Sequence, residues 1–147
     1  MSIQQSDVLY TAAATAENGR DGRVVTHDGR VVTHDGRLDL VVNPPKEMGG
    51  SGAGTNPEQL FAAGYSACFQ GALGVVARRE NADISGSTVT AEVGIGKNDE
   101  GFGITVRISA NIPNVDAATA KDLLEKAHQV CPYSKATRGN ITVDLAV

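Results

Sequence analysis

The spacing of apolar residues predicts strands along much of the chain. Apolar and polar residues alternate over 89–95, 102–112 and 141–147. Since successive side chains of a strand point to opposite faces, this period predicts strands with one face on the core and one toward water. Sheets with one solvent-exposed face are usually antiparallel, so we expect antiparallel pairing. Shorter strands are predicted at 38–42 and around Tyr10.

Two helices are predicted from capping signals and a longer apolar period. The first begins near Thr55-Asn-Pro-Glu58, which fits a capping box or an early helical proline, and ends near Arg78-Arg79. The second runs from about Asp116 to Val130 and stops at Cys131-Pro132. The order of elements predicts one α+β domain over 1–147, with antiparallel sheets wrapped around two central helices.

Seven residues near the N-terminus occur twice in tandem, because GRVVTHD at 22–28 is repeated at 29–35. Each copy carries β-branched residues followed by an Asp-Gly turn signal, so one copy suffices for half of a hairpin. A shift by seven residues, an odd number, turns every side chain to the opposite face. We therefore expect one copy to pair into the sheet and the other to form a hairpin tip or a mobile loop.

Charge and length argue against several classes of partner. The 147 residues fit one domain, and 13 basic against 17 acidic residues give a formal net charge of -4. No concentrated cationic face is available, so neither nucleic acid nor a membrane surface is an expected partner. The N-terminal segment lacks a basic and apolar leader, which predicts a cytosolic protein. The apolar run 60–77 is rich in small residues and is interpreted as a core helix.

Cys68 has two interpretations. The chain holds two cysteines 63 residues apart and no CxxC pair, which argues against a disulfide framework or a zinc site. A buried cysteine often serves as a small hydrophobic residue. A reactive thiol instead needs a lowered pKa, and Cys68 lies too far inside its helix for the helix dipole to supply it. One arginine at about 4 Å would stabilise the thiolate by on the order of 4 kcal/mol. Lowering the thiol pKa by one unit needs only about 1.4 kcal/mol.

Glu58 is the candidate partner for such an arginine, although a glutamate at this place also suits a helix N-terminus. Ten residues of straight helix separate Glu58 from Cys68 by about 15 Å along the axis and about 80° around it. The two therefore cannot share a site within one straight helix. Either the helix starts after Glu58 and the chain folds back, or Glu58 serves the cysteine of a second subunit. We favour a site at a dimer interface.

The histidines carry less specific signals. His128 lies three residues before Cys131 and suits a helix C-terminus, where a cation is favoured. A thiol hydrolase built from Cys68 and His128 is an alternative, although no protease signature surrounds either cysteine. His27 and His34 occupy the same position in the two heptad copies, where each is expected to lie in a turn. Binding a metal ion is the alternative role.

The segments around both cysteines carry a resemblance to a known family. NPEQLFAAGYSACF and HQVCPYSKATRGNI closely resemble the organic hydroperoxide resistance proteins, a branch of the OsmC-like family. LYTAAATAENGRDGR and VGIGKNDEGFGITV extend the resemblance along essentially the whole chain. The chain departs from the family at Lys135, where asparagine is usual, and in the duplicated heptad, which has no counterpart.

The resemblance implies a cytosolic, intertwined α+β homodimer that reduces organic hydroperoxides, alkyl or fatty acyl, by thiol chemistry without haem, metal or other cofactor. Cys68 corresponds to the peroxidatic cysteine and Cys131 to the resolving one. Arg20 corresponds to the catalytic arginine, and Glu58 to the glutamate that holds it. A dithiol such as dihydrolipoamide, or a lipoylated protein, then reduces the disulfide. Apolar residues of the first helix, including Phe69, are expected to line the substrate pocket.

Three alternatives remain open at this point. The duplication places Arg23, Arg30 and Arg37 in similar Asp-Gly-Arg contexts, so each is a second candidate for the catalytic arginine. The cysteine pair also suits a noncatalytic redox sensor or a hydrophobic ligand-binding module. Finally, the protein is an inactive variant if the duplication moves Arg20 out of reach of Cys68.

Overall fold

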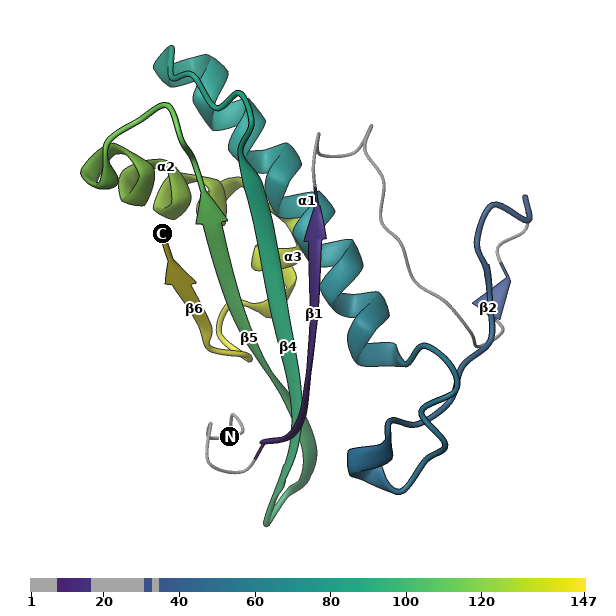
Figure 1. Cartoon of the computed structure of the whole chain (residues 1–147). Helices are drawn as coiled ribbons and strands as arrows, with labels where there is room; N and C mark the ends of the chain where they lie inside the picture. Colours follow the sequence, from purple (N-terminus) through teal and green to yellow (C-terminus); the bar gives the residue numbers. More distant parts are fainter. Residues whose placement is uncertain (1–7, 17–30, 33–34) are drawn as a thin grey trace.

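Figure 1 shows the computed structural model of the chain, which describes residues 8–16, 31–32 and 35–147. The elements confirm the predicted α+β class. In chain order they are β1 (Val8–Ala16), β2 (Val31–Val32), β3 (Asp39–Leu40), the short 3₁₀ helix η3 (Lys46–Met48), α1 (Pro57–Glu80), β4 (Thr88–Asn98), β5 (Gly101–Asn111), α2 (Ala117–Val130), α3 (Pro132–Thr137) and β6 (Val143–Ala146).

The main sheet has four strands in the order β1-β4-β5-β6. β1, β4 and β5 pair antiparallel, as predicted, and β4 and β5 form a hairpin whose turn lies at 99–100. The expectation of antiparallel pairing is wrong for β6, which runs parallel to β5. The reason is the connection between them, because a crossover through two helices returns the chain to the same direction.

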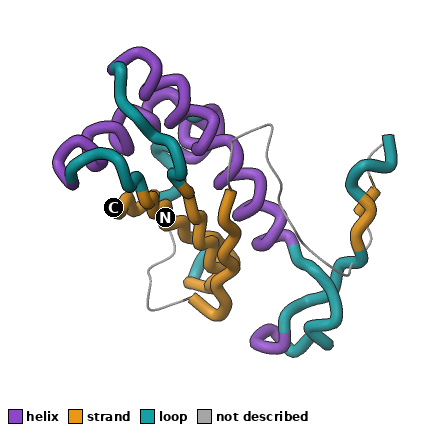
Figure 2. The backbone as a smooth tube through the Cα atoms, turned by 45° about the horizontal axis from the view of Figure 1, so that its top comes forward, coloured by secondary structure: helices purple, strands orange, loops and turns teal. Residues whose placement is uncertain are grey.

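One face of the sheet forms the core with the helices. Val89, Ala91 and Val93 of β4 are fully buried, whereas Glu92 and Arg107 form an exposed ion pair on the other face. The predicted alternation is thus confirmed for the centre of the sheet. It fails at the hairpin tip, where Phe102 is 61% exposed. In Figures 1 and 2 α1 runs along the sheet beside β1 and β4.

α1 begins where the sequence predicts. The Asn56 side chain accepts a hydrogen bond from the Gln59 N–H at 2.8 Å, and proline occupies the first helical position. The helix then continues without interruption to Glu80 and ends at Asn81, which adopts the left-handed conformation. By length and composition α1 is able to cross a membrane, but 61% of its most apolar window is buried inside the protein, as in a core helix.

The chain turns sharply between α2 and α3. α2 is capped by Asp116 and ends at Cys131, as predicted. Cys131 has extended backbone angles because a residue before proline disfavours the helical conformation. Pro132 then starts α3, a helix that the sequence pattern does not predict because six residues are too few to show a period.

A two-stranded ribbon of β2 and β3 projects away from the main sheet (Figure 1). Val31 and Val32 of the second heptad copy pair with Leu40 and Asp39. The pairing is therefore within the ribbon and not within the main sheet. The first copy, at 22–28, lies outside the described residues, so its expected role stays a prediction. The strand predicted at 38–42 is reduced to β3 and a single bridge from Val42 to Thr55.

Candidate active site

The fold brings the two cysteines together. Cys68 lies in the middle of α1 and Cys131 at the junction of α2 and α3, and their sulfur atoms are 3.5 Å apart. The Cys131 thiol donates to the Cys68 sulfur. A disulfide bond is about 2.05 Å long, so both are thiols here and a movement of about 1.5 Å would join them. The pair has the geometry of a reversible disulfide.

Both thiols lie below the surface, Cys68 with 5% and Cys131 with 0% of its area exposed. Burial raises the pKa of Cys131, since the thiolate loses solvation, and the neighbouring Cys68 raises it further. The Ser134 N–H and hydroxyl act in the opposite direction but do not cancel the effect of burial on this pKa. Cys131 is therefore a protonated thiol at neutral pH.

A polar network lies beside Cys131. The Ser134 hydroxyl is 2.8 Å from His128 Nδ1 and 2.9 Å from the Tyr65 hydroxyl, which is also 3.1 Å from Thr137 Oγ1. These groups come from α1, α2 and α3. No local sequence pattern predicts this network, because Tyr65 lies about 70 positions from Ser134 and Thr137.

His128 lies in the last turn of α2, as its sequence position suggested. Burial lowers its pKa, and the positive charge of Arg138 lowers the pKa further. Arg138 also donates from Nη2 to the His128 carbonyl at 2.7 Å. The ring is therefore neutral at pH 7 and does not act as the expected cation at the helix end.

Aromatic packing fixes α3 against α1. Tyr133 lies 5.6 Å from Tyr65 and 6.0 Å from Phe61, measured between ring centroids. A glycine on α1 permits this contact, because a Cβ atom at Gly64 would lie 2.9 Å from the Tyr133 hydroxyl and would displace the ring. Cys131 directly precedes α3, so this packing lies next to the cysteine pair.

Glu58 lies in the first turn of α1, 8% exposed. Since α1 is continuous from Pro57, the alternative in which the helix starts after Glu58 is wrong. Glu58 is then about 15 Å along the helix axis from Cys68. Tyr10 of β1 supports this end of the helix, since its hydroxyl accepts hydrogen bonds from the Asn56 and Gln59 side chains at 3.2 and 3.3 Å.

The candidate arginines are mostly beyond the described residues. Arg20, Arg23 and Arg30 lie outside them, as do His27 and His34. Arg37 lies in the turn of the β2–β3 ribbon, with its side chain 89% exposed and paired with Asp35 at 3.5 Å. Within the part of the chain that the structure describes, no three His, Cys, Asp or Glu residues gather to hold a metal ion.

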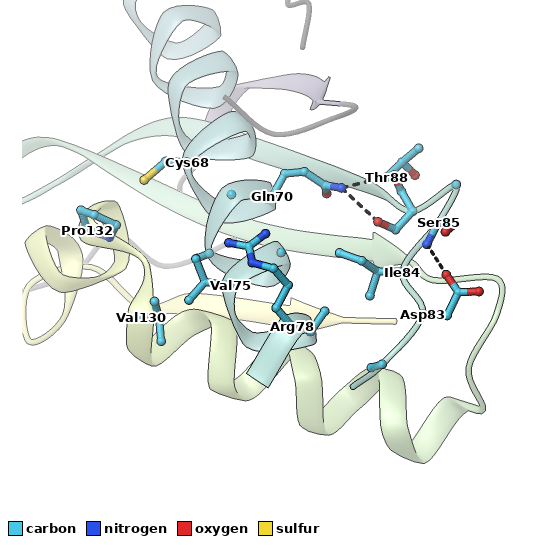
Figure 3. Close-up of a pocket in the computed structure, with 17 residues that line it drawn as sticks. Cys68, Gln70, Val75, Arg78, Asp83, Ile84, Ser85, Thr88, Val130 and Pro132 are labelled. Carbon is cyan, nitrogen blue, oxygen red and sulfur yellow. Dashed lines mark hydrogen bonds between the residues drawn. The ribbon is translucent and has the colours of Figure 1, made fainter. Parts of the chain in front are cut away.

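A cleft of about 940 Å³ opens beside Cys68 (Figure 3). Cys68 and Pro132 lie at one end, and Asp83 and Ser85 at the other. Between them the wall combines apolar residues with Arg78 and with Gln70, whose Nε2 donates to Ser87. Phe69, expected in the pocket, is instead fully buried in the core and does not line this cleft.

Comparisons with known proteins agree with this fold. The family model described as OsmC-like protein matches residues 49–146. An organic hydroperoxide resistance protein of Xanthomonas axonopodis pv. citri is 50% identical, covering 95% of each chain. Organic hydroperoxide resistance protein OhrB of Bacillus subtilis is 45% identical, covering 93% of this chain and 96% of its own.

Solved structures give the same result. The crystal structure of an organic hydroperoxide resistance protein from Elizabethkingia anophelis superposes with a TM-score of 0.75 at 49% identity, over 94% of each chain. The chain therefore belongs to the OsmC-like family, and within that family to the organic hydroperoxide resistance branch that its cysteine motifs predicted.

Proposed function

We propose that the protein is a thiol peroxidase that reduces organic hydroperoxides to alcohols. The observation that carries the proposal is the 3.5 Å between two buried sulfur atoms, one of which lines an open cleft. The printed names of the relatives, organic hydroperoxide resistance proteins, support the same chemistry. A protein that only binds hydrophobic ligands has no need of two adjacent thiols.

The reaction begins at Cys68, whose thiolate attacks the outer oxygen of the hydroperoxide. The O–O bond breaks, the alcohol leaves, and Cys68 becomes a sulfenic acid. Cys131 condenses with this sulfenic acid, so that a disulfide forms and water leaves. The disulfide protects Cys68 from irreversible oxidation. A dithiol, dihydrolipoamide or a lipoylated protein, restores both thiols by exchange.

Arg20 is proposed to stabilise the Cys68 thiolate and the charge that develops on the departing alkoxide, with Glu58 as its ion-pair partner. Because one continuous helix keeps Glu58 about 15 Å from Cys68, we assign this Glu58 to the cysteine of the second subunit of a homodimer. No metal or other cofactor takes part in these steps.

The cleft is proposed to hold the organic part of the substrate. Apolar side chains along it, including Val75, Ile84 and Val130, would bury an alkyl or fatty acyl tail at about 25 cal/mol per Å². Hydrogen peroxide has no such tail and is expected to be a poorer substrate. The proposed location is the cytosol, where a dithiol reductant is available.

The test is steady-state reduction of cumene hydroperoxide with dihydrolipoamide, compared with hydrogen peroxide. We expect Cys68→Ser to lower peroxide reduction by at least about a hundredfold. Cys131→Ser is expected to react once with peroxide and then fail in repeated turnover. Equal activity of wild type and Cys68→Ser would contradict the proposal, and a single oxidation without turnover in the wild type would indicate a redox sensor.

A further inference from the structure

The formation of the disulfide poses a chemical problem that the cysteines alone do not solve. Cys131 must lose its proton before or during its attack on the sulfenic acid, because the thiolate is the nucleophile. Burial raises the Cys131 pKa, so only a small fraction is thiolate at neutral pH. With no exposed area, the thiol also has no direct access to a base in solution.

Ser134 and His128 offer a path for that proton. Cys131 is the residue at which α3 is capped, and Ser134 lies three residues later in the first turn, with its hydroxyl facing the Cys131 sulfur. The same hydroxyl is 2.8 Å from His128 Nδ1. His128 is only partly buried, so its ring connects the buried serine with solvent.

The protonation states fit a transfer toward the ring. A lowered pKa keeps His128 neutral at pH 7, and a neutral ring with its proton on Nε2 leaves Nδ1 as an acceptor. Ser134 then donates to Nδ1 and accepts from Tyr65. In the reduced protein the Cys131 thiol donates to the Cys68 sulfur, and the Ser134 hydroxyl lies beside the Cys131 sulfur. Among the described groups, Arg138 supplies the charge that acts on His128. Tyr65 and Cys131 are the titratable groups that lie next to Ser134 on its other sides.

We propose that Ser134 and His128 form a proton relay for the disulfide-forming step, an inference that rests on the proposed function. Once Cys68 is oxidised, the Cys131 thiol turns from the Cys68 sulfur to Ser134. Its S–H bond breaks, its proton passes to Ser134 Oγ, and the Ser134 proton passes to His128 Nδ1. The Cys131 sulfur is oxidised as it bonds to Cys68, whose sulfur is reduced as its S–O bond breaks. Hydroxide leaves and becomes water with the proton that His128 returns to solvent.

The experiment follows one turnover of the pre-reduced protein with one equivalent of cumene hydroperoxide, between pH 5 and 9. Rapid quenching and mass spectrometry separate Cys68 sulfenic acid from disulfide. In the wild type, disulfide formation should slow as pH falls through the pKa of His128, which lies below the ordinary histidine value of about 6.5. His128→Asn places an amide oxygen near the position of Nδ1, and so keeps a hydrogen-bond acceptor for Ser134 without a base.

We expect His128→Asn and Ser134→Ala to form sulfenic acid at the wild-type rate but disulfide about ten- to a hundredfold more slowly at pH 7. Their rates should rise with pH as Cys131 ionises unaided, without the wild-type dependence on His128. Tyr65→Phe is the matched control, because it removes a hydroxyl that is bonded to Ser134 but carries no proton in the proposed relay. Its pH profile should keep the wild-type shape.

The outcomes separate the two proposals. An unchanged disulfide rate and pH profile in His128→Asn, with normal sulfenic acid formation, would overturn the relay and leave the peroxidase intact. A wild-type protein that forms no sulfenic acid at Cys68 would overturn the proposed function, and the relay with it. Imidazole in the buffer that restores disulfide formation to His128→Ala would support the relay, since a merely structural role of His128 predicts no such rescue.

Discussion

At the scale of single residues, the two sulfur atoms differ in their surroundings. Cys68 lines the cleft, whereas Cys131 is fully enclosed and its pKa is raised by burial. This difference fits the proposed mechanism, in which the substrate reacts with Cys68 and Cys131 reacts only with the oxidised Cys68. The surroundings of His128 also change its chemistry, because burial and the positive charge of Arg138 lower its pKa.

The lowered His128 pKa makes a prediction about stability. The unfolded chain binds a proton at about pH 6.5 and the folded protein only at lower pH, so unfolding takes up a proton between the two values. This contribution to stability is complete above about pH 6.5 and is lost as pH falls through the lowered pKa. We expect the urea midpoint to fall more steeply from pH 7.5 to 5 in the wild type than in His128→Asn.

His27 and His34 provide the internal control for that comparison, since both proteins contain them and their titration cancels in the difference. Midpoints that fall in parallel over this range would show that the surroundings of His128 do not disfavour its protonation.

At the scale of elements, the critical contact joins α1 to α3. Gly64 permits Tyr133 to lie against α1, and the aromatic cluster of Phe61, Tyr65 and Tyr133 holds the start of α3 in place. Because Cys131 directly precedes α3, a displacement of this short helix changes the distance between the sulfur atoms.

Gly64→Ala tests that contact. An alanine in a helix interior normally stabilises by about 1 kcal/mol relative to glycine, but here its Cβ would lie 2.9 Å from the Tyr133 hydroxyl. We expect Gly64→Ala to lose most of this gain in urea unfolding and to slow disulfide formation. Adding Tyr133→Phe removes the shortest of these contacts and should restore part of both quantities, since the ring carbons remain at 3.3 and 3.4 Å. Full stabilisation by Gly64→Ala alone would contradict this account.

At the scale of the whole molecule, one chain does not bring Glu58 to Cys68. They lie about ten residues apart on an unbroken helix, so a joint site needs a second copy of the chain.

Mixed dimers test whether Glu58 acts across subunits. Each dimer formed from Glu58→Ala and Cys68→Ser chains would contain one complete site if Glu58 serves the partner's cysteine. We expect an equal, re-equilibrated mixture to recover about one quarter of wild-type activity, because half of the dimers are mixed and each has one working site. If Glu58 acts within its own subunit, every site lacks one residue and the mixture stays inactive. Light scattering of the wild type provides the accompanying measure of dimer formation.

Local patterns in the sequence determined the elements of this protein. Alternation identified β4, β5 and β6, capping signals placed the start of α1, and the proline after Cys131 placed the end of α2. The motifs around Cys68 and Cys131 identified the family. These features depend on neighbours within a few positions, so a single sequence contains them. The six residues of α3 and the direction of β6 were not predictable in this way, because neither leaves a periodic signal.

Tertiary structure alone decided how distant residues meet. It set the 3.5 Å between sulfur atoms 63 positions apart, the contact of Ser134 with His128 and Tyr65, and the continuity of α1 that separates Glu58 from Cys68. Such distances follow from the packing of α1, α2 and α3 on one sheet, and packing depends on the whole set of buried side chains rather than on any one segment.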